Sequence, residues 1–187
     1  LFRSRLAGMV GTRPAWHEYV LAEMGVLHLL CRAGQQLDVL DRSHPALADA
    51  VRTALGRTVR QADVLAQPAE DGRWAVCGRS ERFEERFVVR RQWLRNLETQ
   101  QWALMLSFAV TGQVFDEPLR TGSIVRAAVH RYPGLHELRC VVEHPETVLF
   151  AVGYEPPLPG AGTVAQACAE VGSAIASLPW LERWPVN

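Results

Sequence analysis

The chain has 187 residues, of which 48% are hydrophobic, and its 20 basic and 20 acidic side chains give a formal net charge of zero. This length and composition are typical of a globular protein with one substantial core or two small ones, and they exclude a disordered chain. The balanced charge removes the general electrostatic expectation of nucleic-acid binding. All 20 basic residues are arginine, so no lysine within the chain can form a Schiff base or bind a phosphate.

The expected compartment is the cytoplasm, and no membrane contact is expected. No run approaches the roughly 18–20 uninterrupted apolar residues that a membrane-spanning helix needs. Residues 11–14 (Gly-Thr-Arg-Pro) interrupt any apolar stretch near the start, so no signal peptide is visible. Because the chain begins at Leu1 and ends soon after a Trp-rich segment, we expect it to be part of a longer protein.

Two helices are predicted near the N-terminus. In residues 15–33, apolar side chains recur every three or four residues and form one stripe of an amphipathic helix, and Gly34 follows as a C′ residue. Ser43 and Pro45 mark the start of the second helix, as the N-cap and a first-turn residue. One further helical turn is expected around residues 62–66.

A series of strand-like segments separated by turn residues follows. The predicted strands are residues 73–78, 83–94, 102–110, 123–132, 137–142 and 147–154. Along residues 83–94 we expect the apolar face to contact the core and the polar face, which includes Arg90 and Gln92, to contact water. Residues 102–110 are apolar on both faces, so we expect them to form the most central strand.

The order of these elements predicts an α+β fold with N-terminal helices, a mostly antiparallel sheet or partial barrel of about six strands, and a C-terminal helix. Thr163 is the expected N-cap of that last helix, residues 164–177. The domain organisation we expect is a helical region over residues 1–68 and an antiparallel β domain with its C-terminal helix over residues 69–187.

The densest basic feature lies in and before the second predicted strand. Residues 79–95 hold six arginines against three glutamates, a net charge of +3, and the arginines are Arg79, Arg82, Arg86, Arg90, Arg91 and Arg95. Guanidinium groups beside aromatic rings can stack on single-stranded bases or bind phosphates, which makes nucleic-acid binding one hypothesis. The alternative is a solvated face whose Arg–Glu pairs keep the sheet from aggregating.

No metal site or cofactor is predicted. The four cysteines are far apart in sequence and lie in apolar contexts, so we expect them to be buried and reduced. His136, Cys140 and His144 recur every fourth residue, a spacing that would align metal ligands on a helix. The segment reads as a strand, on which residues four apart are separated by about 13 Å, too far for one ion.

Two further candidates remain. His130 could act with Asp116 or Glu117 as an acid–base pair if its strand folds back beside the preceding turn, which makes a hydrolase a third hypothesis. No nucleophile motif accompanies these residues, and we predict no catalytic residue. Trp180 and Trp184 make the C-terminal segment unusually apolar, so they are expected to pack on the core or bind a partner.

Several segments occur in a recognisable order between His44 and Val186, over roughly three quarters of the chain. They are HPALADAVRTALGRTVRQADVLAQ, RWAVCGRS, FVVRRQWL, WALMLSFAVTGQVFD, RYPGLHELRCVV and PWLERWPV. Together they resemble the part downstream of the zinc finger in bacterial SWIM zinc-finger family proteins. The finger itself, Cys-x-Cys followed by Cys-x-His, is absent, so no zinc ligand can be assigned to this chain.

The resemblance implies an accessory portion of a longer cytoplasmic protein whose finger binds nucleic acid or protein, with an ATPase-type protein as a partner. Our leading hypothesis from the sequence is therefore a non-enzymatic protein-interaction or scaffolding module. Nucleic-acid binding through the arginine-rich strand is the second hypothesis.

Overall fold

The computed structural model describes residues 15–84, 87–110, 115, 119–150, 162–181 and 183–186. It confirms an α+β fold with N-terminal helices and a C-terminal helix. The chain divides into two compact units, Leu1–Thr58 with Ala169–Trp184 and Val59–Cys168 with Pro185–Asn187. This division falls ten residues before the boundary expected at residue 68 (68 − 58), and it groups most of the C-terminal helix with the N-terminal helices. No helix in the described ranges is long and apolar enough to cross a membrane.

The first unit contains the helices α2 (Trp16–Gln35), α3 (Leu37–Ser43) and α4 (Pro45–Ala54). The predicted helix over residues 15–33 is confirmed, but it continues through Gly34. Ser43 is not the N-cap of the next helix as predicted, because it ends α3 and its hydroxyl donates a hydrogen bond to the carbonyl of Val39 at 2.9 Å. Pro45 does occupy the first turn of α4.

The C-terminal helix α6 (Val164–Ser177) has the predicted bounds and the predicted cap. The backbone N–H of Gln166 donates to the Thr163 hydroxyl at 3.2 Å, and the backbone N–H of Thr163 donates to the Gln166 side-chain oxygen at 2.7 Å. These two reciprocal bonds form a capping box, which satisfies amide groups at the start of the helix that have no partner within it.

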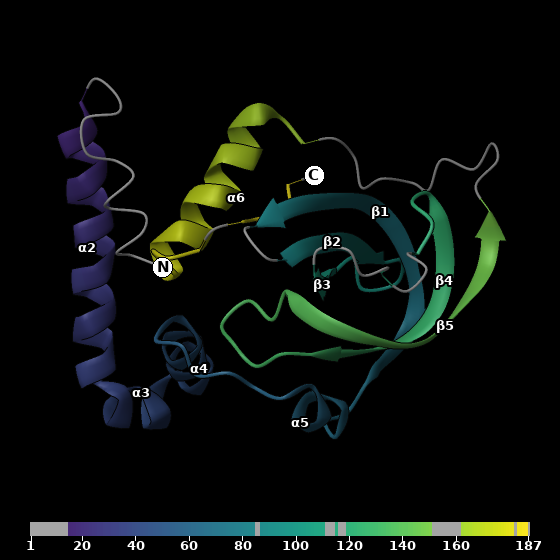
Figure 1. Ribbon diagram of the computed structural model, residues 1–187, viewed down its shortest axis with the longest axis horizontal. Coiled ribbons are helices and arrows are strands. Elements are labelled where there is room, and N and C mark those ends of the chain that lie inside the picture. The colour runs from purple at the N-terminus through teal and green to yellow at the C-terminus, as the bar shows by residue number, and fades with distance from the viewer. Residues whose placement is uncertain are drawn as a thin grey trace. The chain divides into compact units, whose positions relative to one another are not determined.

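The second unit is built on a closed five-stranded barrel, preceded by the short helix α5 (Gln61–Leu65) (Figure 1). Its strands are β1 (Glu70–Glu84), β2 (Phe87–Asn96), β3 (Trp102–Val110), β4 (Ser123–Arg131) and β5 (Arg139–Phe150). Their order around the barrel is β1-β2-β3-β5-β4. All neighbours are antiparallel except β3 and β5, which pair in parallel at Leu104 with Arg139 and Met105 with Cys140.

The strand boundaries differ from the prediction at two places. Residues 83 and 84 belong to β1, so the predicted strand 83–94 is divided between β1 and β2. The predicted strands 137–142 and 147–154 are one strand, β5, up to residue 150; residues 151–154 lie outside the described part of the chain. Pro145 does not end β5, because the β4–β5 pairing shifts register between Arg126 and Ala128, and this irregularity accommodates a residue without an N–H.

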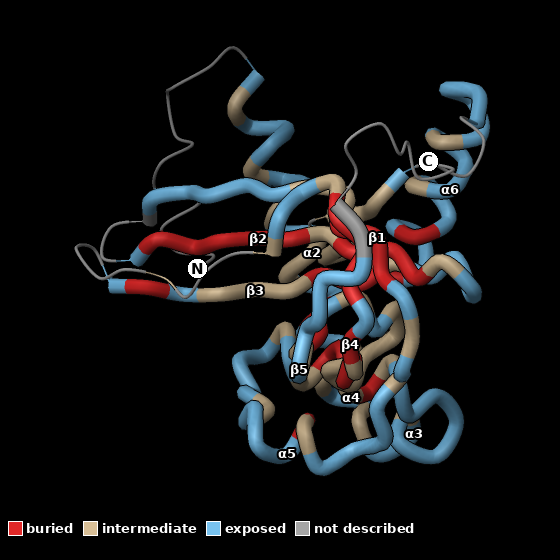
Figure 2. Tube along the Cα trace, turned by 90° about the vertical axis from the view of Figure 1, so that its right-hand side faces the viewer, coloured by how far each residue is buried: buried red, intermediate tan, exposed pale blue. Residues whose placement is uncertain are grey.

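The long strand β1 takes part in two pairings. Its first part, Glu70 to Ala75, pairs with β4 and closes the barrel, and from Trp74 onward it pairs with β2 (Figure 1). Beyond the barrel, residues 78–84, 87–93 and 105–110 continue as a three-stranded extension that we call the ribbon. Figure 2 shows β2 as the buried middle strand of the ribbon, so β2 and not β3 is the central strand there.

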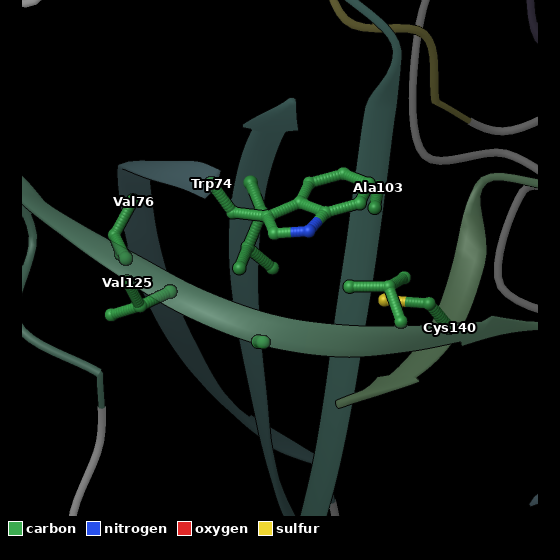
Figure 3. Close-up of a cluster of buried hydrophobic side chains, with 8 residues drawn as sticks. Trp74, Val76, Ala103, Val125 and Cys140 are labelled. Carbon is green, nitrogen blue, oxygen red and sulfur yellow. The ribbon is translucent and has the colours of Figure 1, made fainter. Parts of the chain in front are cut away.

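The barrel core is formed by apolar side chains that alternate along the strands toward the interior (Figure 3). Its buried members are Trp74, Val76, Leu94, Ala103, Val125, Ala127, Val129 and Cys140. The indole of Trp74 extends across the interior toward Ala103. Burial raises the pKa of the Cys140 thiol to about 12, so this cysteine behaves as a small apolar side chain.

The interior face of β2 also holds polar side chains, which corrects the expectation that they face water. Gln92 pairs with Met105 and Arg90 pairs with Ser107, on the same face as the core residue Leu94. Gln92 is fully buried and donates to the carbonyl of Leu119 at 2.7 Å. Alternation along the strand separates the two faces correctly, but the face predicted to contact water is buried as well, since Val89 on one face and Gln92 on the other are both buried.

One end of the barrel is closed by a polar cluster around the Glu70–Arg131 ion pair. Arg131 donates to Glu70 through Nε at 3.1 Å and Nη2 at 2.9 Å, and its Nη1 donates to the carbonyls of Trp102 and Glu137, both at 2.9 Å. Asn96 also donates to Glu70, at 2.9 Å. Because these groups satisfy one another, the interior end can be polar without large desolvation cost.

Candidate interaction surface

The outer face of the ribbon carries a cluster of exposed apolar side chains. Phe87 is 49% exposed, Phe108 is 58% exposed and Val110 is 48% exposed. Phe87 lies directly opposite Val110, and Phe108 lies opposite the buried Val89, so all four side chains share one face of the sheet. We call this set, Phe87, Phe108 and Val110, the outer apolar face. Val89, between them, is buried, but three neighbouring apolar side chains that are about half exposed on one face of a sheet mark a candidate interaction site.

The outer apolar face has one exposed cation beside it among the described residues. Arg82 pairs with Val89 across β1 and β2, so its side chain lies on the same face, and it is exposed. Arg79 is also exposed, but it pairs with Gln92 and therefore lies on the opposite face. Arg86 lies outside the described residues.

The other predicted nucleic-acid-binding arginines are buried. Arg90, Arg91 and Arg95 are each 9% exposed or less. Arg90 forms an ion pair with Glu81 at 2.9 Å, and its guanidinium lies 4.1 Å from the ring centre of Phe115. These contacts hold the charge inside the protein, where it is shielded from phosphate groups in solution.

Arg95 is held in a similar way at the other end of β2. Its Nε donates to the side-chain oxygen of Gln100 at 3.1 Å, and its guanidinium lies 4.8 Å from the ring centre of Trp102. Trp102 in turn makes an edge-to-face contact with Trp93, with the ring centres 6.2 Å apart. The arginine-rich segment is therefore largely a structural element of β2 and its neighbours.

Among the residues that the structure describes, the second edge of β3 is unpaired along the ribbon. β3 pairs with β5 only at Leu104 and Met105, and no other strand in the described part of the chain pairs with residues 106–110 on that side. The N–H of Leu104 donates to the carbonyl of Leu138 and so points away from β2. Because backbone direction alternates along a strand, the N–H and C=O groups of Leu106, Phe108 and Val110 also point away from β2, toward the open edge.

The structure places His130 away from water and gives it a partner that the sequence did not suggest. His130 is buried, its Nδ1 lies 2.9 Å from the carbonyl oxygen of Gln67, and its Nε2 lies 3.1 Å from a carboxylate oxygen of Glu143. Asp116 and Glu117, the predicted acidic partners, lie outside the described residues. The two contacts of His130 link the segment after α5 to β4 and β5, which is a structural role.

The cysteine and tryptophan predictions have mixed outcomes. Cys140 is buried as expected, Cys77 is half-buried, and Cys31 and Cys168 are exposed, which corrects the prediction for these two. Within the described ranges, no three His, Cys, Asp or Glu side chains come together to hold a metal ion. Trp180 and Trp184, the predicted partner-binding residues, are both half-buried.

The sequence contained a signal for the open edge that the prediction did not use. Residues 102–110 include no charged side chain and no proline, the two devices that usually protect an exposed strand edge. The same lack of charge led to the prediction of a central strand.

No protein-family model matches the chain, and comparisons with curated proteins and with solved structures found no match.

Proposed function

We propose that the chain is a non-enzymatic protein-interaction module of a cytoplasmic SWIM-type zinc-finger protein, with an ATPase-type protein as a candidate partner. The family assignment rests on the sequence resemblance. The observation that carries the proposal is the outer apolar face of the ribbon. Phe87, Phe108 and Val110 are about half exposed on one face of a sheet that extends beyond the barrel core. A folded protein rarely exposes such a cluster unless another surface covers it.

The proposed partner surface is apolar with a complementary acidic residue for Arg82. Aromatic side chains in the centre of a protein interface contribute most of the binding energy, and truncating one costs about 2 kcal/mol or more in favourable cases. A partner bound in this way is held mainly by apolar contact, so its affinity should change little with salt. This salt response separates the proposal from binding to a polyanion.

The experiment is to identify the partner by affinity purification and mass spectrometry and then to reconstitute binding with both purified proteins. We expect the double variant Phe87→Ser/Phe108→Ser to lose most of the affinity measured by calorimetry. Leu21→Ser is the matched control, because Leu21 is 72% exposed but lies on α2, far along the chain from the ribbon. Equal binding by the wild type and the double variant would refute the proposed surface.

Binding of single-stranded nucleic acid is a second candidate, favoured by the topology. A five-stranded Greek-key barrel with the order β1-β2-β3-β5-β4 has the arrangement of an OB-fold, in which the face of strands 2 and 3 binds oligonucleotides. Phe87 on β2 and Phe108 on β3 are placed on the outer side of this sheet, with Arg82 beside them. Aromatic rings of this kind can stack on unpaired bases.

The burial of Arg90, Arg91 and Arg95 makes this candidate second to protein binding, and the fold similarity alone does not establish a function. A titration with single-stranded oligonucleotides across a salt series tests it. If nucleic acid is the ligand, affinity falls steeply with salt and Arg82→Glu weakens binding at every oligonucleotide sequence. Absence of binding at low salt would remove this candidate and leave the protein-binding proposal intact.

A further inference from the structure

The open edge of β3 is chemically different from the other open edge of the ribbon. On the β1 side, residues 79–82 include Arg79, Glu81 and Arg82, and charged side chains on an edge strand oppose pairing with another chain. On the β3 side, residues 106–110 (Leu-Ser-Phe-Ala-Val) include no charge. The two edges therefore differ in the protection that natural sheets use against self-association.

We propose that the β3 edge pairs with the same edge of a second copy of this chain, which forms a homodimer with a sheet continuous across both ribbons. This inference goes beyond the proposed function, because it concerns the backbone edge of β3 and holds whether or not the outer apolar face binds a partner. A second copy fits the edge because pairing two uncharged, apolar strands places no charge against a like charge. An acidic or basic peptide would bring unpaired charges to an apolar edge, at a desolvation cost.

The alternation of backbone groups defines the register of this pairing. Leu106, Phe108 and Val110 direct their N–H and C=O groups to the open edge, so two antiparallel copies of β3 can form hydrogen-bonded pairs between these residues. A two-fold axis at Phe108 places Phe108 opposite its own copy and Leu106 opposite Val110 of the second copy. Ser107 then lies opposite Ala109, again without charge.

This arrangement also extends the apolar surface. Leu106, Phe108 and Val110 lie on the outer side of the sheet, next to Phe87 of the adjoining strand. In the dimer, these side chains from both copies become neighbours across the two-fold axis, where aromatic pairs on one face of a sheet stabilise strand pairing. The pairing therefore covers the backbone edge and joins the outer apolar faces of the two copies into one larger surface, which stays available to the proposed partner.

The primary test is the mass of the purified chain in solution, measured by analytical ultracentrifugation and by light scattering over a range of concentrations. We expect a dimer for the wild type. Phe108→Arg places two like charges directly opposite each other at the two-fold axis, and we expect this variant to be a monomer with an unchanged circular dichroism spectrum. The matched control is Phe83→Arg, because Phe83 is an exposed aromatic residue on the β1 edge, and this variant should remain a dimer.

A crosslink tests the register without depending on the fold of an arginine variant. In a hydrogen-bonded antiparallel pair the Cα atoms lie about 5.5 Å apart, a distance that a disulfide spans. In a background in which the exposed Cys31 and Cys168 are replaced by serine, Phe108→Cys should form a disulfide-linked dimer on mild oxidation, and Phe83→Cys should not.

The outcomes separate the two proposals. A wild-type chain that stays monomeric at high concentration, or a Phe108→Cys variant that fails to crosslink, would overturn the dimer. Loss of partner binding in Phe87→Ser/Phe108→Ser from a chain that is monomeric throughout would overturn the dimer and support the proposed function. If Phe108→Cys crosslinks and, in a separate experiment, partner binding survives Phe87→Ser/Phe108→Ser, the dimer is supported and the proposed surface is refuted.

Discussion

The Glu70–Arg131 ion pair should be the most sensitive polar contact in the barrel. Arg131→Met keeps the length and much of the volume of the side chain but removes the guanidinium. The substitution eliminates both hydrogen bonds to Glu70 and those to the carbonyls of Trp102 and Glu137. It also removes the cation that lies 5.8 Å from the ring centre of Trp74.

The magnitude follows from the burial of the two partners. Removing one partner of a fully buried ion pair costs about 3–5 kcal/mol, because the remaining charge stays desolvated. Here the side chain of Arg131 is 15% exposed and that of Glu70 is 27% exposed, so water can reach part of the remaining carboxylate. Asn96 also continues to donate to Glu70. We therefore expect Arg131→Met to lower the free energy of unfolding by about 2–3 kcal/mol.

Urea unfolding followed by Trp fluorescence measures this loss, and Arg73→Met provides the control. Arg73 pairs with Glu98 at 2.9 Å, but these side chains are 55% and 48% exposed. Removing an exposed pair of this kind costs under about 1 kcal/mol. Both substitutions remove an Arg–Glu ion pair, but the Arg131 pair is the more buried one and Arg131 also donates to two backbone carbonyls.

Two results would refute the reasoning about the barrel end. The first is an equal loss of stability for Arg131→Met and Arg73→Met, which would mean that burial does not decide the cost. The second comes from a double-mutant cycle with Glu70→Gln. If the losses of Arg131→Met and Glu70→Gln simply add, the two side chains do not interact in the way the structure shows.

Three further predictions concern stability. Burial raises the pKa of Cys140 from 9.0 to about 12, so between these pH values the unfolded chain loses the thiol proton and the folded chain keeps it. The free energy of unfolding of the wild type should therefore fall by roughly 1 kcal/mol per pH unit relative to that of Cys140→Ala, measured by urea unfolding at each pH. Thr163→Ala removes the capping box with Gln166 and should cost about 1 kcal/mol, seen as faster amide exchange in the first turns of α6; unchanged exchange would contradict the cap. Gly122→Ala should lower the free energy of unfolding by about 1 kcal/mol, because Gly122 has a φ of 85°, which strains an alanine; the space around the added methyl group is open, so a clash is not the cause. Gly25→Ala, within α2, should raise the free energy of unfolding by about 1 kcal/mol. Thermal unfolding of both variants tests these opposite signs.

Local patterns predicted the elements well where the signal is contained in adjacent residues. The cap at Thr163 and the strand Trp102–Val110 have the expected bounds, because a capping box and a run of β-forming residues are both readable within a few positions. The fold class followed from the order of these elements. The joining of two predicted strands into β5 could not be predicted from the order of the elements, because the irregularity that accommodates Pro145 depends on the pairing with β4.

Contacts between distant residues could not be predicted from spacing. The alternation in β2 separates Arg90 and Gln92 from Val89, but it does not say which side is the interior. That choice depends on Glu81, which neutralises Arg90 from the neighbouring strand, and on the carbonyl of Leu119, which accepts a bond from Gln92. The open edge of β3 likewise depends on how few residues of β5 pair with it.

The division of β1 between two partners has a consequence for the order of folding. β2 and β3 follow β1 closely in the chain, so hairpin contacts can form as soon as residue 110 has left the ribosome. The closure of β1 against β4 requires a segment about fifty residues further along, such as Ile124 opposite Ala75. During synthesis the hairpins can therefore form before β4 is available to enclose Trp74, whose indole stays exposed to water in that interval.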